Sequence, residues 1–425
     1  MSRPIEAAAA VFALLLLSSC ASLAPAGRLP TGPDAGDQAL SPFYRWDGPL
    51  PARPGVMLRE EAQPAQAEID AAASARRILY TSTDVRWGSG QVPVSGTLYL
   101  PQGTAPAGGW PLVAWAHGTL GVADVCAPSW AMHKPRDAVY INRWLKAGFA
   151  VVATDYQGLG GPGPHPYLIW QAESRSVLDS VRAALAARPG QIANAVIATG
   201  QSQGSGPAIG AALIARDYAP DIRLRGAVGT GVVSTFPDGP YQPPASAAAG
   251  GGAPHYTILS LVGGGLRDDA PSVDTLVSQA GQSLLAKARS DCSPELSALA
   301  RQLKVDMAGA FSVPLATLES HRRPVTDMKA TRVDVPLLLG TGLADRLIPP
   351  QRQYGAVAAL CAAGNSVTWK GYPGVGHNGS PHAAFDDALA FARAGLAGQA
   401  VRGNCASIAP PGQPGAMAPG LPFND

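Results

Sequence analysis

The sequence predicts an α/β fold in which a mostly parallel sheet is flanked by helices. Short apolar runs typical of buried strands alternate with amphipathic runs, a pattern produced by parallel strands joined through right-handed crossovers. This alternation is lost between about residues 235 and 330 and then resumes, so we expect an inserted helical cap there. The chain has 425 residues, 46% of them hydrophobic, which is enough for one large domain with such an insertion.

Each element follows from its local pattern. Residues 76–88 and 92–101 alternate, are rich in β-branched side chains and flank a Gly-Ser-Gly turn, which predicts a hairpin. Further along the chain, continuous apolar runs predict buried strands. The segments between these runs have apolar residues at helical spacing and predict helices. The expected strands are 110–118, the start of 149–161, 194–200, 224–233, 335–345 and 366–373; the expected helices are 138–148, 174–188, 206–219, 354–363 and 382–395.

These patterns divide the chain into six parts. The segment after the leader is rich in proline, alanine and glycine, and we expect it to wrap the surface without regular structure. The expected parts are a signal peptide (1–26), an extended segment (27–70), the first part of the core (71–234), the helical cap (235–330), the second part of the core (331–405) and a Pro/Gly-rich, extended tail (406–425).

The N-terminus has the features of an export signal. Arg3 precedes an apolar core at 7–17, which is shorter than the roughly 20 apolar residues of a membrane-spanning helix. Leu17–Cys20 resembles a bacterial lipobox, in which Cys20 would be lipidated and would anchor the protein in the cell envelope, most simply at the outer membrane. The alternative is ordinary cleavage after Ala26 and secretion. Both routes predict an exported protein.

Charge and cysteine usage exclude several classes of protein. Lys+Arg 32 and Asp+Glu 30 give a formal net charge of +2 without a basic block, so we expect no nucleic-acid partner. There is no C-x-x-C pair and no convincing ligand cluster, so we expect no metal and no cofactor. An even number of cysteines after the leader predicts two disulfides with three possible connectivities; these cysteines are Cys126, Cys292, Cys361 and Cys405.

Ser202 is the candidate nucleophile. It stands in Gly200-Gln-Ser-Gln-Gly204, a G-x-S-x-G pattern between an expected strand and an expected helix. In a nucleophile elbow the serine occupies a strained turn at this place, and small neighbours let the helix approach the strand. A glycine-rich turn without activity is the alternative, and the strand-to-helix context favours the elbow.

A serine nucleophile needs a base and an orienting carboxylate, which on this fold follow it in the order acid, then histidine. Asp345 comes directly after an expected strand, at the carboxyl end where catalytic groups lie. Asp334 precedes the same strand and falls at the wrong end; for Asp345 itself the alternative is a helix N-cap. His377 follows the next strand and is the expected base, with His382 as the second candidate.

An oxyanion hole requires two backbone N–H groups near the nucleophile. One is expected from Gln203, the residue after the serine. The other is expected from the loop after strand 110–118, either from Gly118 or from Thr119. We interpret His117 as a loop residue bonded to nearby backbone, and Tyr156 as a residue that contacts substrate from a rigid pocket wall.

Together these motifs resemble the secretory lipase family of α/β hydrolases, which includes fungal lipase-A-type enzymes. The resemblance extends from about residue 41 to 405. It is carried by HGTLGVADVCAPSW (117–130), ATDYQGLGGPGPHPYL (153–168), GQSQGSG (200–206), GTGLADRLIP (340–349) and GYPGVGH (371–377).

The resemblance implies an α/β-hydrolase fold with a helical cap inserted before the acid-bearing strand. It also implies a Ser202–Asp345–His377 triad and two disulfide pairs, Cys126–Cys292 and Cys361–Cys405. The oxyanion loop departs from that of the fungal relatives, so the resemblance does not choose between Gly118 and Thr119.

The sequence thus predicts an exported serine carboxylic ester hydrolase, a lipase or esterase acting on hydrophobic acyl esters through an acyl-enzyme. An acyltransferase of the same fold is one alternative. A non-catalytic, lipid-anchored binding protein on a hydrolase scaffold is another. The expected partners are a small-molecule ester or lipid substrate and, through Cys20 alone, a membrane.

Overall fold

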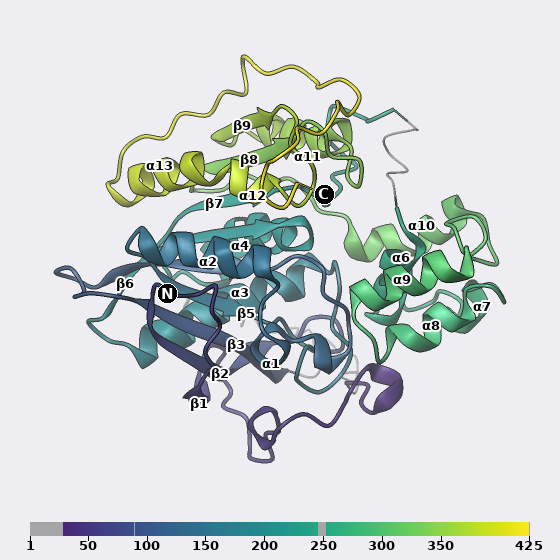
Figure 1. The fold of residues 1–425 in the computed structure, drawn as a ribbon, viewed down its shortest axis with the longest axis horizontal. Coiled ribbons are helices and arrows are strands. Elements are labelled where there is room, and N and C mark those ends of the chain that lie inside the picture. Colours follow the sequence, from purple (N-terminus) through teal and green to yellow (C-terminus); the bar gives the residue numbers. More distant parts are fainter. Residues whose placement is uncertain (1–28, 89, 245–251, 425) are drawn as a thin grey trace, which may run out of the picture.

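A computed structural model describes residues 29–88, 90–244 and 252–424. The expected signal peptide, with Cys20 and Ala26, lies outside the described residues. A sheet with helices on both faces forms the main body, and a separate group of helices lies beside it (Figure 1). Within the described residues, no helix is long and apolar enough to cross a membrane.

One sheet of nine strands runs through the main body, in the order β1-β2-β3-β5-β4-β6-β7-β8-β9. The first three strands are antiparallel, β3 pairs antiparallel with β5, and all later pairs are parallel. The strands are β1 (Met57–Ala62), β2 (Ala72–Thr83), β3 (Gln91–Pro101), β4 (Trp110–Ala116), β5 (Ala150–Thr154), β6 (Ile192–Gln201), β7 (Leu224–Thr230), β8 (Leu337–Gly342) and β9 (Val367–Tyr372).

The register brings the carboxyl ends of the parallel strands to one edge of the sheet. Ala116 at the end of β4 is paired with Gly200 near the end of β6, and Gln201 is paired with Thr230 of β7. Thr230 is in turn paired with Gly340 of β8. The loops that leave these strands therefore meet at this edge, where open α/β sheets bind their ligands.

Helices cover both faces of the sheet, which explains why the strands read as nearly continuous apolar runs. On one face a core cluster joins the sheet to α3 (Trp170–Ala187), α4 (Ser205–Tyr218) and α11 (Pro350–Ala362). On the other face a second cluster joins it to α2 (Pro135–Lys146) and α13 (Phe385–Leu396). Two short helices, α1 (Pro128–Ala131) and α12 (Ser380–Ala383), lie in the connecting loops.

The chain between β7 and β8 is helical where the alternating pattern is lost. Its helices share a separate apolar cluster that includes Leu259, Leu284, Leu296 and Leu318. They are α6 (Pro254–Val262), α7 (Val273–Leu276), α8 (Gln282–Ala288), α9 (Ser293–Leu303) and α10 (Leu315–Thr326), and they form the group beside the main body in Figure 1.

Two local predictions are wrong. The composition of segment 27–70 predicts no regular structure, but the segment contains β1 and two short 3₁₀ helices, Pro33–Ala35 and Pro42–Tyr44. The β1 sequence MLREEA is half charged, and its side chains are half-buried or exposed at the sheet edge, so it has no apolar alternation to detect. The last predicted helix is interrupted, since α12 ends at Ala383 and α13 begins at Phe385.

Candidate active site

Ser202 occupies a sharp turn between β6 and α4. Its φ is 56°, a left-handed backbone conformation that residues other than glycine rarely adopt. Such a residue costs about 1–3 kcal/mol and persists only where the surrounding structure enforces it. The turn leaves Ser202 partly accessible, whereas Gln201 and Gln203 on either side are buried.

The two glycines of the pattern are required by close backbone contacts. A Cβ on Gly200 would lie 1.9 Å from the carbonyl oxygen of Gly204. A Cβ on Gly204 would lie 1.9 Å from the carbonyl oxygen of Ala116 and 2.8 Å from that of His117. The serine turn therefore packs directly against the end of β4 and the loop that follows it, so the pattern reflects close packing and not flexibility.

His377 and Asp345 join Ser202 in one chain of hydrogen bonds. Nε2 of His377 lies 2.8 Å from Oγ of Ser202, and Nδ1 of His377 lies 2.7 Å from Oδ2 of Asp345. Asp345 is fully buried and His377 is 5% exposed. With Nδ1–H donating to the carboxylate, the other ring nitrogen is free to accept the serine proton.

The carboxylate of Asp345 is held from several directions. Its Oδ1 accepts the backbone N–H groups of Leu347 at 3.0 Å and Ile348 at 2.8 Å, while its Oδ2 accepts Nε2 of Gln353 at 2.8 Å. Asp345 therefore caps the turn that follows β8 and also contacts His377. Gln353 lies on α11, and the sequence offered no signal for it because an amide has no motif of its own.

The loop that carries His377 is fixed through its backbone. The carbonyl oxygen of His377 accepts Nε2 of Gln201 at 3.2 Å and Oγ of Ser380 at 2.8 Å. From the tail, Oδ1 of Asn424 accepts the N–H of Gly376 at 2.6 Å, and Nδ2 of Asn424 donates to the carbonyl of Gly374 at 2.9 Å. The Pro/Gly-rich tail thus braces the histidine loop, a contact that its composition does not indicate.

The alternative acid and base lie in other surroundings. The ring of His382 packs against those of Tyr140 and Phe423. Asp334 is exposed and forms an ion pair with Arg216. Neither takes the position beside Ser202.

The residues expected at the oxyanion hole lie on adjoining segments. A Cβ on Gly118 would lie 3.3 Å from the carbonyl oxygen of Gln201, the residue before the serine. Thr119 is fixed by its side chain, since its Oγ1 lies 2.7 Å from the hydroxyl of Tyr167. The carbonyl oxygen of Thr119 also accepts Nζ of Lys134 at 3.2 Å.

His117 and Tyr156 support this loop from inside the core. Both ring nitrogens of His117 contact backbone oxygens, Nδ1 that of Gly118 at 2.7 Å and Nε2 that of Asp155 at 3.3 Å, and burial lowers the pKa of the ring. The expectation that Tyr156 contacts substrate is not supported. Its side chain is fully buried, and its hydroxyl donates to the carbonyl of His117 at 3.0 Å.

Two disulfides connect distant segments. Cys126–Cys292 joins the segment after the oxyanion loop to the start of α9, and Cys361–Cys405 joins α11 to the segment after α13, just before the tail. Beside the first disulfide, the N–H of Ser293 donates to the carbonyl of Leu120 at 2.7 Å. The loop that carries the expected oxyanion donors is therefore attached to the helices of the insertion.

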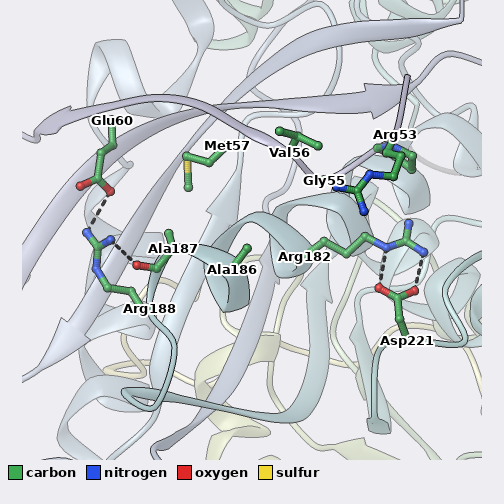
Figure 2. A pocket seen from close by; sticks show the side chains of 11 residues that line it. Arg53, Gly55, Val56, Met57, Glu60, Arg182, Ala186, Ala187, Arg188 and Asp221 are labelled. Atoms are coloured by element: carbon green, nitrogen blue, oxygen red, sulfur yellow. Dashed lines mark hydrogen bonds and ion pairs between the residues drawn. The ribbon is translucent and has the colours of Figure 1, made fainter. Parts of the chain in front are cut away.

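A surface cavity of about 860 Å³ lies elsewhere, between β1 and the end of α3 (Figure 2). Two of its three arginines form ion pairs, Arg182 with Asp221 and Arg188 with Glu60. Across the described parts of the chain, no cluster of three His, Cys, Asp or Glu side chains could hold a metal ion. The hydrogen-bonded group at the strand ends is thus the strongest candidate for chemistry.

The order of the strands and the helices on both faces of the sheet give this chain the α/β-hydrolase fold. Residues 128–309 match the family model of the secretory lipases, which confirms the resemblance seen in the sequence motifs. No curated protein sequence matches the chain.

Two solved structures of lipases and esterases share this fold at low sequence identity. Candida antarctica lipase A is 18% identical, with 86% of each chain covered and a TM-score of 0.67. The rice cell wall degrading esterase LipA from Xanthomonas oryzae is 18% identical, with 82% of this chain and 97% of that chain covered and a TM-score of 0.57. The chain is thus similar to the secretory lipases over residues 128–309, and it shares its fold with a lipase and an esterase.

Proposed function

We propose that the protein is an exported serine carboxylic ester hydrolase in which Ser202, His377 and Asp345 form the catalytic triad. The observation that carries this proposal is the continuous chain of hydrogen bonds from Ser202 through His377 to Asp345. The strained turn at Ser202 supports it, because such strain is concentrated at functional sites. A non-catalytic binding protein on this scaffold would need neither the chain of hydrogen bonds nor the strained turn.

In the proposed mechanism, Oγ of Ser202 attacks the ester carbonyl while Nε2 of His377 takes its proton. Asp345 holds the ring and stabilises the imidazolium that forms. The N–H of Gln203 and an N–H of Gly118 or Thr119 bind the oxyanion. The tetrahedral intermediate expels the alcohol, which takes the proton from His377. Water, activated by the same ring, then releases the acid and restores Ser202.

We further propose that segment 235–330 is a cap and that the substrate carries a hydrophobic acyl chain. The apolar cluster of the insertion supports this, because it also includes Val122 and Tyr167 from loops at the carboxyl edge of the sheet. Rates on p-nitrophenyl esters of increasing chain length, measured below and above substrate solubility, distinguish a lipase from an esterase. A lipase gains activity above the solubility limit, whereas an esterase does not.

Replacement of Ser202 by Ala tests the catalytic proposal directly. We expect it to abolish turnover of p-nitrophenyl esters and covalent labelling by a fluorophosphonate, with little change in melting temperature. Full activity in S202A would overturn the assignment. Absence of labelling in the wild-type protein would favour the binding-protein alternative, and product esters formed with added alcohol would favour the acyltransferase.

Export and lipidation are proposed from the leader sequence. Cys20 in Leu17–Cys20 would become the lipidated N-terminus, and the family match to secretory lipases supports export. Metabolic labelling with a fatty acid in a bacterial host tests this. Label in the wild type and its loss in Cys20→Ser support the anchor, whereas an unlabelled, secreted wild-type protein supports ordinary cleavage after Ala26.

A further inference from the structure

We propose that residues His165–Leu168, together with Glu173, form a strut that fixes the two sides of the oxyanion hole relative to each other. This inference rests on the proposed function, because it assigns positioning roles in that same site. The strut lies in the His-Pro-Tyr-Leu segment between β5 and α3 and in the first turn of α3. Its contacts reach Gln203 on one side and Thr119 on the other.

On the nucleophile side, the strut binds the amide group of Gln203. Nε2 of Gln203 donates to Oε1 of Glu173 at 2.7 Å and to Nε2 of His165 at 2.8 Å. His165 can accept because its Nδ1–H donates to the carbonyl of Gln157 at 2.9 Å, which fixes the tautomer. All three side chains are buried, with at most 1% of each exposed. The N–H of Gln203 is therefore oriented through its own side chain.

On the opposite side, the strut binds the oxyanion loop. The hydroxyl of Tyr167 lies 2.7 Å from Oγ1 of Thr119, and Tyr167 is buried. Tyr156 supports the same loop, since its hydroxyl holds the carbonyl of His117 while its ring stacks on His165 with centroids 5.5 Å apart. The segment that orients Gln203 thus also holds the loop containing Gly118 and Thr119.

Glu173 joins the two sides at one carboxylate oxygen. Besides Gln203, its Oε1 accepts the backbone N–H of Leu168 at 3.0 Å. Leu168 has a φ of 63°, so this hydrogen bond holds a strained backbone directly after Tyr167. Displacement of Glu173 would therefore move Gln203 and the Tyr167 segment together.

A simpler structural role accounts poorly for a carboxyl group at this position. Glu173 is 1% exposed, and within the described residues no lysine or arginine pairs with it; burial raises its pKa to about 8. Burial of a carboxyl group without a charged partner is unfavourable in either protonation state, and an apolar side chain of similar volume is often as stable. A carboxyl group at this position is explained by its oxygen Oε1, which accepts hydrogen bonds from both Gln203 and Leu168.

The helical insertion also contacts the strut. A Cβ on Gly263, directly after α6, would lie 2.4 Å from the carbonyl oxygen of His165 and 2.9 Å from the N of Tyr167. The end of α6 therefore rests on the backbone of the strut. A displacement of this helix would be transmitted to both oxyanion donors.

Steady-state kinetics on a soluble p-nitrophenyl ester test the proposal. Tyr167→Phe and Glu173→Leu should each lower kcat about 10- to 100-fold, because small misplacements of stabilising groups have effects of this size. KM should stay within about threefold. Glu173→Gln keeps an acceptor oxygen for Gln203 and Leu168 and should restore kcat to within about threefold of wild type. Thr119→Val combined with Tyr167→Phe should be no slower than either single variant.

Tyr218→Phe is the matched control. It also removes a tyrosine hydroxyl bonded to a threonine, Thr83, and to the carboxylate of Asp179, but this half-buried side chain lies at the far end of α4. Its kcat should equal that of the wild type.

If Tyr167→Phe, Glu173→Leu and Gln203→Met all keep wild-type kcat while S202A is inactive, the proposed strut is overturned and the proposed function stands. Activity in S202A would overturn the proposed function instead. If Glu173→Leu fails to fold, the kcat values of Tyr167→Phe and Gln203→Met test the strut instead.

Discussion

Nε2 of His377 lies 2.8 Å from Oγ of Ser202, although 175 positions separate the two residues in the chain. His377 follows β9 and Ser202 follows β6, and these two strands are three places apart in the sheet. Adjacent strands in a sheet are about 4.8 Å apart. The histidine loop therefore runs back across the ends of β8 and β7. Glycines make room for it: a Cβ on Gly342 would lie 2.5 Å from the carbonyl of Val375, and one on Gly231 3.0 Å from Cε1 of His377.

This crossing predicts that Gly342→Ala lowers activity by moving His377. The added Cβ would overlap backbone oxygens of the histidine loop, so the loop must shift and the contact with Ser202 must lengthen. We expect kcat to fall at least about 10-fold, measured with a p-nitrophenyl ester. Gly412→Ala is the control, because nothing lies within 4 Å of its added Cβ. Equal kcat in the two variants would contradict the crowding argument.

Asp345→Asn should lower kcat by about 10⁴-fold with little change in KM, because an amide favours the wrong tautomer of the paired imidazole. The carboxamide has nearly the same shape, and its oxygen can still accept from Leu347 and Ile348. Asp334→Asn removes an exposed carboxylate paired with Arg216 and should keep kcat within about twofold. Steady-state kinetics of both variants decide between Asp345 as a catalytic group and as a turn cap alone.

Removal of the two disulfides should separate stability from activity. Each pair of Cys→Ser substitutions should lower the free energy of unfolding by about 2–5 kcal/mol. Only loss of Cys126–Cys292 should also lower kcat, since that disulfide attaches the oxyanion loop to α9. Loss of Cys361–Cys405 should leave kcat unchanged. Urea unfolding and ester kinetics at 25 °C test this, and equal kcat values for the two double variants would refute it.

Glu173 should make stability depend on pH. Burial raises its pKa from the ordinary 4.5 to about 8. Between these values the folded protein keeps a proton that the unfolded chain has lost, so the free energy of unfolding falls as the pH rises. Glu173→Gln lacks this titration, so its stability relative to wild type should increase from pH 5 to pH 8, by an amount on the order of a few kcal/mol.

Urea unfolding of the wild type and Glu173→Gln at both pH values measures this difference. Burial lowers the pKa of the neighbouring His165 to about 3, so it stays neutral in the folded state over this range. Its contribution is present in both proteins and cancels in the comparison. A stability difference that is the same at pH 5 and pH 8 would show that Glu173 does not retain its proton.

The sequence determined those features that local chemistry encodes. Buried strands are marked by continuous apolar runs, and the turn at Ser202 by glycines whose close contacts allow no side chain. The order of Ser202, Asp345 and His377 followed from the rule that catalytic groups leave the carboxyl ends of parallel strands. β1 escaped detection because a polar edge strand depends on its pairing with β2 and not on its own pattern.

Only the tertiary structure decided which polar side chains support these groups. Gln353 holds Asp345, Asn424 braces the His377 loop, and Glu173 joins Gln203 to the Tyr167 segment. Hydrogen bonds between distant residues leave no periodicity or spacing in the chain, because they depend on where folded segments meet. The sequence thus specified the groups proposed to react, and the packing of the sheet and its loops specified the groups that hold them.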